Sequence, residues 1–263
     1  MTDKWPPDSW LQENWLSDRR NEFMASLAFC TRLPLWPTTA IHGGTLSRAA
    51  WAFPIAGIVV GLIAAAVYGL THRAGVPAWP AAALSVAATL LVTGCLHEDG
   101  LADTADGFGG GDTREKKLAI MRDSRIGTYG VCALAISLLI RTDAIASLTE
   151  TGLVAAALIA AHSGGRAAMA AVMFFLPPAR SDGLSFAAGQ PTAARAALAA
   201  AIGFLIVLFC LGPAHAIVAV IVVAIAVALL AWLSVRQIGG QTGDVIGAVE
   251  QVSEIAILLV ALR

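Results

Sequence analysis

Residues 79–107 read WPAAALSVAATLLVTGCLHEDGLADTADG, so an apolar stretch of membrane-span length runs directly into a cluster of carboxylates. Asp99, Asp103 and Asp106 are spaced i, i+4 and i+7, which places them on one face of a helix. Three carboxylates on one face repel each other unless a cation lies between them. Carboxylate oxygens are the ligands that Mg²⁺ prefers, so the spacing predicts a magnesium site formed by these three aspartates.

The composition places the chain among helical membrane proteins. Of its 263 residues, 57% are hydrophobic and 13% are charged, whereas a soluble domain carries about 25% charged residues. A bilayer-spanning helix needs about 20 apolar residues, so we expect an all-α polytopic bundle of about six to seven transmembrane helices. The runs are Trp51–Leu70, Trp79–Leu96, Tyr129–Leu148, Leu153–Leu176, Ala196–Leu211, Ala214–Leu233 and Val245–Leu262.

The N-terminal part is predicted to lie outside this bundle. Residues 1–21 form a polar tail, and residues 22–263 form a single integral membrane domain. A short interfacial or re-entrant helix is expected over Glu22–Leu33, because Pro34 and Pro37 would end it.

Lysine and arginine counts predict the orientation. Five basic residues precede Trp51 and five lie in the loop 97–128, whereas the loop after the first run has only Arg73. Such residues collect on the cytoplasmic side of a membrane. We therefore expect the N-terminus, the aspartate loop, loop 177–195 and loop 234–244 to face the cytoplasm, in the inner membrane of a bacterium.

A basic segment follows the carboxylates. Residues 121–130 read MRDSRIGTYG, and Arg122 and Arg125 are candidates to bind phosphate, which guanidinium groups grip with paired hydrogen bonds. The loop 97–128 thus has carboxylates that could bind a metal in its first half and arginines that could bind phosphate in its second half, a combination that suits metal-assisted phosphoryl transfer. The alternative is a solvated charged loop. Asp123 adds a further candidate catalytic carboxylate.

Polar residues inside the later apolar runs are costly in lipid and need a role. Arg141, His162 and Arg166 are predicted to contact substrate phosphate; a pairing of Arg141 with Asp143, and an interhelical clamp by His162 and Arg166, are the alternatives. Glu250 and Glu254 are expected to be functional or paired.

The sequence GGQTGD at 239–244 opens the last apolar run, and such glycine-rich backbone can cradle phosphate. Asp244 is a candidate helix N-cap, metal ligand or catalytic base.

Three motifs together resemble the cobalamin synthase family, the adenosylcobinamide-GDP ribazoletransferases. They are HEDGLADTADG at 97–107, MRDSRIGTYG at 121–130 and GQTGD at 240–244, and the resemblance extends from about Glu22 to the C-terminus. Arg141, His162, Arg166 and Arg180 also fall where that family tends to have such residues. Glu98 is a departure, because the family usually has a hydrophobic residue there.

The resemblance implies the final step of the assembly of the coenzyme B12 nucleotide loop. The family joins adenosylcobinamide-GDP to α-ribazole or its 5′-phosphate, releases GMP and requires Mg²⁺. A ribazole hydroxyl would attack the phosphorus nearer the cobinamide, and one of Asp106, Asp123 or Asp244 would take its proton. The sequence does not choose among these three.

Two other functions share some of these sequence features. A CDP-alcohol phosphotransferase also carries an Asp-Gly-x-x-Ala motif at a membrane helix end, but its later spacing of arginine and aspartates is missing here. A cation or metabolite transporter would line its path with Arg141, Arg166 and Glu254, yet no inverted repeat is visible. The expected partners are the two small-molecule substrates and membrane lipid, without nucleic acid. The oligomeric state stays open, a homo-oligomer included.

Overall fold

The computed structural model describes residues 8–34, 44–148 and 150–263, and every regular element in these ranges is a helix. Lys4 and Pro37 lie outside the described residues. The elements are α1 (Asp8–Cys30), α2 (Thr45–Ala49), η1 (Ala50–Ala52), α3 (Phe53–Arg73), α4 (Ala78–Thr93), α5 (Leu96–Gly110), α6 (Arg114–Ile120), α7 (Thr128–Ser147), α8 (Thr151–Phe175), α9 (Gly183–Ala188), α10 (Ala193–Ile238) and α11 (Gly243–Val260).

The prediction of an all-α membrane bundle is confirmed. Among the described residues, four helical segments are long and apolar enough to cross a bilayer, and the bent pair of α4 and α5 makes a fifth if it counts as one span. The four are Thr45–Arg73, Thr128–Ser147, Thr151–Phe175 and Ala193–Ile238.

The 46 residues of α10 comprise two helices that meet at Gly212. Gly212 has a left-handed φ of 78°, and residues from both sides of it, Gly203 and Val223 among them, line the same apolar cavity against α8. The chain therefore folds back at Gly212. The two predicted runs Ala196–Leu211 and Ala214–Leu233 correspond to these two halves.

A sharp bend separates α4 from the carboxylate-bearing helix α5. Gly94 and Cys95 both have left-handed φ angles, 64° and 57°, and the helix axis turns by 91° across them. Glycine commonly ends a helix in this conformation. The expected run Trp79–Leu96 is thus interrupted at Thr93, and α5 ends at Gly110, within the triplet Gly109–Gly111.

Small residues allow α3 and α8 to pack closely, as they commonly do between membrane helices. A Cβ atom on Gly57 would lie 2.4 Å from the carbonyl oxygen of His162, and one on Gly61 would lie 2.7 Å from the Cα of Ile159. This contact fixes the position of α8, which carries His162 and Arg166.

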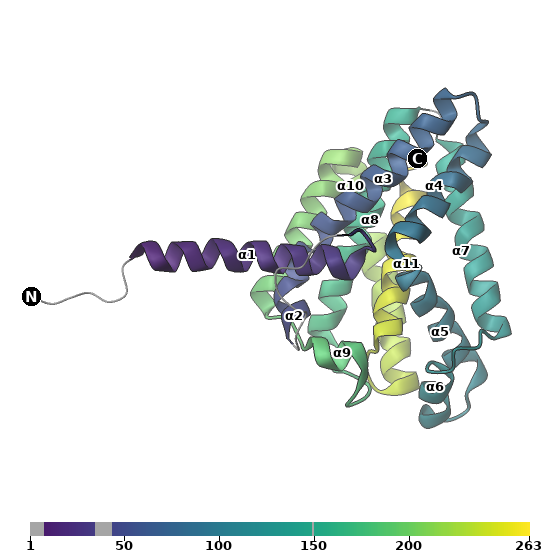
Figure 1. Cartoon of the computed structure of the whole chain (residues 1–263). Coiled ribbons are helices and arrows are strands. Elements are labelled where there is room, and N and C mark those ends of the chain that lie inside the picture. The colour runs from purple at the N-terminus through teal and green to yellow at the C-terminus, as the bar shows by residue number, and fades with distance from the viewer. Residues whose placement is uncertain (1–7, 35–43, 149) are drawn as a thin grey trace, which may run out of the picture.

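The polar loops meet at one end of the bundle. Figure 1 shows α6 and α9 near that end, opposite the C-terminus. A backbone bridge joins Pro178 to Gln241, and the Arg114 side chain donates to the carbonyls of Ile238 and Ala179. The loops 97–128, 177–195 and 234–244 are therefore brought together here.

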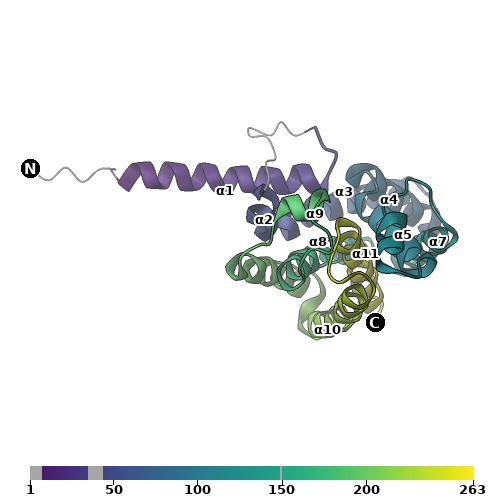
Figure 2. The same cartoon turned by 90° about the horizontal axis from the view of Figure 1, so that it is seen from below.

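Helix α1 extends sideways from the bundle, as both views show (Figures 1 and 2). It begins at Asp8, so the prediction that the helix starts at Glu22 was wrong. Residues 8–21 contain no proline or glycine, and nothing in them stops a helix. Glu22 anchors α1 to the bundle through an ion pair with Arg195 of α10 at 2.9 Å.

Candidate active site

Two of the three predicted aspartates face an open pocket. Asp99 and Asp103 of α5 line a cavity of about 410 Å³ together with Arg122, Asp123 and Ser124 from the segment after α6. The acidic and basic halves of the loop 97–128 thus meet around one space, as the sequence predicted.

Asp106 has a different role from its two neighbours. Its carboxylate is buried and accepts hydrogen bonds from the backbone N–H of Gly127 at 2.7 Å and of Gly130 at 2.9 Å, at the start of α7. A Cβ atom on either glycine would lie within 2.5 Å of an Asp106 oxygen. Asp106 therefore caps α7, and these bonds oppose its predicted roles as metal ligand and base.

Asp244 reaches the carboxylates of α5 because two helices approach closely. A Cβ atom on Gly100 would lie 2.7 Å from the carbonyl oxygen of Asp244, and one on Gly247 would lie 3.2 Å from the backbone of His97. Only glycine permits this approach of α5 to α11. It places Asp244 near enough to Asp99 and Asp103 for their charges to interact.

Asp244 does not cap its helix. The N-cap of α11 is Thr242, whose hydroxyl accepts from the Val245 N–H, so the N-cap interpretation of Asp244 was wrong. The Thr242 hydroxyl also donates to Asp244 at 3.1 Å. Burial raises the pKa of Asp244, while the bond from Thr242 and the nearby Arg180 lower it in part.

Asp99, Asp103 and Asp244 form a cluster of like charge. At Asp103, the charges of Asp99, Asp244 and Asp106 add to one another, and Arg180 is the cation that opposes them most. Asp99 is exposed, and Asp103 and Asp244 are partly buried. Carboxylates with this excess of negative charge and only hard oxygen donors fit Mg²⁺. The pocket therefore offers Asp99 and Asp103 as the residues that could hold a metal. Asp244 is a further carboxylate beside them, whereas Asp106 is held by the backbone at the start of α7.

Asp123 and Arg125 pair with each other. Arg125 donates to both carboxylate oxygens of Asp123, the shortest of these bonds being 2.6 Å, and both side chains are solvent-accessible. The hydrogen bonds from Arg125 lower the pKa of Asp123 to about 2. Asp123 is therefore a weak proton acceptor near neutral pH. Arg122, in contrast, pairs with Asp182 and lines the carboxylate pocket.

Arg141, His162 and Arg166 lie inside the bundle. Arg141 is 1% exposed and lies 2.8 Å from both Glu98 and Glu254, and Arg166 is fully buried and 2.7 Å from Glu250. Their partners are thus carboxylates of α5 and α11, and a phosphate would have to displace these. This geometry opposes the predicted phosphate contacts. The pairing of Arg141 with Asp143 was wrong, whereas the clamp of His162 and Arg166 agrees with the contacts.

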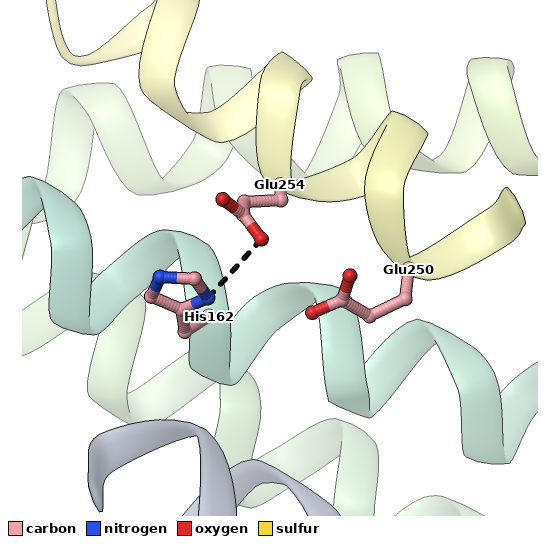
Figure 3. Close-up of side chains that lie close together, drawn as sticks. All are labelled: His162, Glu250 and Glu254. Carbon is pink, nitrogen blue, oxygen red and sulfur yellow. Dashed lines mark ion pairs between the residues drawn. The ribbon is translucent and has the colours of Figure 1, made fainter. Parts of the chain in front are cut away.

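Figure 3 shows how His162 of α8 faces Glu254 and Glu250 of α11. Ligand atoms of these three residues lie within 4.8 Å of one another, the spacing that a metal site needs. Arg141 and Arg166 already contact the two glutamates, so a divalent cation would meet two guanidinium groups in a buried site. We interpret the cluster as an ion-pair network that holds α5, α7, α8 and α11 together.

Three basic residues in the polar loops had no predicted site role. Arg180 lies 3.8 Å from both Asp182 and Asp244. The buried Lys117 ammonium binds the carbonyls of Phe108 and Gly111 at the end of α5, where a cation stabilises a helix. Arg114 joins three segments as described above. Sequence spacing gives no signal for these contacts, because their partners are backbone oxygens or residues distant in the chain.

Comparison with known proteins gives one consistent result. A family model described as cobalamin-5-phosphate synthase matches residues 22–262. Proteins named adenosylcobinamide-GDP ribazoletransferase from Bradyrhizobium diazoefficiens and Mesorhizobium japonicum are each 53% identical to the chain, across 89% of its length and 90% of theirs. The protein of that name from Azorhizobium caulinodans is 49% identical, across 89% of this chain and 92% of its own. The comparison with solved structures gave no match.

Proposed function

Since this chain belongs to the family of cobalamin-5-phosphate synthases, we propose that it transfers adenosylcobinamide phosphate from adenosylcobinamide-GDP to α-ribazole or its 5′-phosphate, with release of GMP. In this reaction a ribazole hydroxyl oxygen bonds to the phosphorus nearer the cobinamide. The bond from that phosphorus to the GMP oxygen breaks, and the hydroxyl proton passes to a carboxylate.

Asp99 and Asp103 are the proposed ligands of Mg²⁺. They line the open pocket, carry only oxygen donors and lie among like charges that a cation would relieve. Bound Mg²⁺ would neutralise the pyrophosphate oxygens and the leaving phosphate. Asp106 is left to hold the start of α7 through the backbone of Gly127, the residue before the helix, and of Gly130 in its first turn.

Asp244 is the proposed proton acceptor among the three carboxylates that the sequence left open. Asp106 already accepts two backbone hydrogen bonds, and the low pKa of Asp123 makes that group a weak base. Burial instead raises the pKa of Asp244, which increases its affinity for a proton. Thr242 and Arg180 orient its carboxylate.

Arg122 is the proposed contact for the phosphate charge in this pocket. It is the one arginine among the residues described as lining the cavity with Asp99 and Asp103. Its ion pair with Asp182 is solvent-accessible, and such pairs contribute at most about 1 kcal/mol, so substrate phosphate can compete for the guanidinium.

We also propose a location. The polar end of the bundle would face the cytoplasm of a bacterial cell from its inner membrane, and membrane lipid would contact the exposed apolar side chains of α10, such as Leu205 and Phe209. This places the open pocket where nucleotides are available.

The observation that carries the proposal is the pocket in which Asp99 and Asp103 meet Arg122. The test is GMP release by the purified protein in detergent, given adenosylcobinamide-GDP, α-ribazole and Mg²⁺. We expect GMP and the joined corrinoid in equal amounts, and no product when EDTA removes the metal. Folded protein that releases no GMP with either form of ribazole would contradict the proposal and favour a transporter.

A further inference from the structure

A second pocket lies beside the carboxylate pocket, at the polar end of the bundle. Its volume is about 510 Å³, and it is formed by α6, the segment after α8 and α9. Pockets for small ligands have volumes of roughly 300–1,000 Å³. Arg114, Arg122 and Arg180 line it, together with Asp182 and Phe186.

The charge of this pocket is positive. Three guanidinium groups face one carboxylate, Asp182, among its lining residues. Arg114 is held in place by the carbonyls of Ile238 and Ala179, which leave its positive charge without a carboxylate partner at those bonds. The Nη1 atom of Arg180 is buried and has no hydrogen-bond partner among the described residues, and an unpaired buried donor is costly. A bound anion would neutralise the charge of Arg114 and accept a hydrogen bond from Nη1 of Arg180.

Two residues connect this pocket to the carboxylates. Arg122 lines both cavities, and Arg180 lies 3.8 Å from Asp182 on one side and 3.8 Å from Asp244 on the other. A ligand phosphate on these arginines would therefore lie next to the carboxylate pocket. Guanidinium groups bind phosphate oxygens with paired, parallel hydrogen bonds.

An aromatic side chain completes the pocket. Phe186 of α9 is 51% exposed, although large aromatic residues usually bury most of their surface. Nucleobases stack favourably on aromatic rings, because every base has a flat π face. An exposed ring in a pocket lined by three arginines matches a ligand with a base at one end and a phosphate at the other.

We propose that this arginine pocket, defined by Arg114, Arg122, Arg180 and Phe186, binds a nucleoside 5′-phosphate. The arginines take the phosphate and Phe186 takes the base. The inference rests on the proposed function, whose reaction has two ligands of this chemistry: the GMP part of adenosylcobinamide-GDP and α-ribazole 5′-phosphate. Either would be held with its phosphate toward Asp99 and Asp103.

The test is equilibrium binding of GMP and, separately, of α-ribazole 5′-phosphate to the purified protein in lipid nanodiscs with EDTA present. We expect Arg180→Gln to weaken binding of the ligand that occupies the pocket at least tenfold. Arg236→Gln is the matched control, because Arg236 lies at the same end of the bundle and stacks on Trp232. It should bind as the wild type does.

Phe186→Ala provides a second variant if Arg180→Gln fails to fold. We expect it to weaken binding of the nucleoside phosphate severalfold and to leave binding of ribose 5-phosphate unchanged. Wild-type affinity of both variants for both nucleoside phosphates would overturn the inference. Failure of the proposed function is a separate result: it would appear as absent GMP release, whatever the binding shows.

Discussion

At the scale of single residues, neighbours on one helix face have distinct environments. Asp103 lines an open pocket among other carboxylates, whereas Asp106, less than one turn further on, is buried against the backbone of α7. Spacing alone treats them as equivalent, because both lie on the same face of α5. The difference arises from Gly127 and Gly130, which let the chain approach Asp106.

The decline of activity at low pH should reflect protonation of Asp244. A proton acceptor must be ionised, so activity should fall as pH decreases through the raised pKa of Asp244. We expect Asp244→Asn to lower kcat on the order of 10²-fold or more and to remove this decline. Asp123→Asn should keep the wild-type profile, because its low pKa keeps Asp123 ionised across neutral pH. If Asp123→Asn lost the decline at low pH and Asp244→Asn kept it, Asp244 would not be the base.

Arg141 should matter more for stability than either of its partners. Arg141→Met would remove the guanidinium that pairs with both buried carboxylates, Glu98 and Glu254, and loss of a buried ion-pair partner costs about 3–5 kcal/mol. It would leave Glu254 with His162 and Glu98 with the Gln251 amide. Glu98→Leu should cost less, because Arg141 keeps Glu254 and Gln251. Thermal unfolding in detergent measures both variants. Equal melting temperatures for the two would mean that the network does not act through Arg141.

At the scale of elements, the close approach of α5 and α11 assembles the carboxylate pocket. The buried ion-pair network inside the bundle involves four helices, α5, α7, α8 and α11. Gly100 and Gly247 set the distance between α5 and α11, the two helices that carry the site. The buried network and the site are therefore connected through the same pair of helices.

Gly100→Ala should separate these helices. Its methyl group would lie 2.7 Å from the Asp244 carbonyl oxygen, too close for a carbon atom, and overpacking of this kind costs about 1–3 kcal/mol. We expect lower turnover with a retained helical circular dichroism spectrum. Gly152→Ala is the control, since nothing lies within 4 Å of the added methyl group. Wild-type turnover by Gly100→Ala would show that this contact does not position Asp244.

Sequence patterns predicted the helices better than the bends between them. Apolar runs such as those of α7 and α8 report directly on burial in lipid, so their bounds agree within a few residues. The bend at Gly94 and Cys95 depends on two left-handed residues inside one apolar run, which hydropathy does not detect. The sequence predicted Asp99, Asp103 and Arg122 as candidate site residues, and all three line the pocket. The roles of Asp106 and Arg180 depend on contacts with backbone and with residues distant in the chain, which one sequence does not reveal.

At the scale of the whole molecule, the polar loops gather at one end and the C-terminus lies at the other (Figure 1). Long apolar helices join the two ends, and both halves of α10 expose apolar side chains along their length. One end of the molecule thus carries both the carboxylate pocket and the arginine pocket.

Labelling with a membrane-impermeant thiol reagent in intact cells tests the orientation. In a background without the four native cysteines, we expect Ala74→Cys, in the loop after α3, to react from outside. Ser181→Cys, in the arginine pocket, should react only after the membrane is opened. The opposite pattern would place the site on the external face, away from cytoplasmic nucleotides.

The proposed reaction depends most on a metal held by the carboxylate pocket, which Asp99 and Asp103 line. The most direct measurement is GMP release by Asp103→Asn over a titration of Mg²⁺, with Asp112→Asn as control, because Asp112 is exposed and pairs with Lys116. Loss of a group that only supports a metal ligand already lowers activity or metal affinity by about 10–100-fold, so loss of a ligand should lower it at least as much. We predict such a loss in Asp103→Asn with a shift to higher Mg²⁺ concentration, and none in Asp112→Asn. Turnover of Asp103→Asn within a few-fold of wild type, with an unchanged Mg²⁺ dependence, would contradict the account.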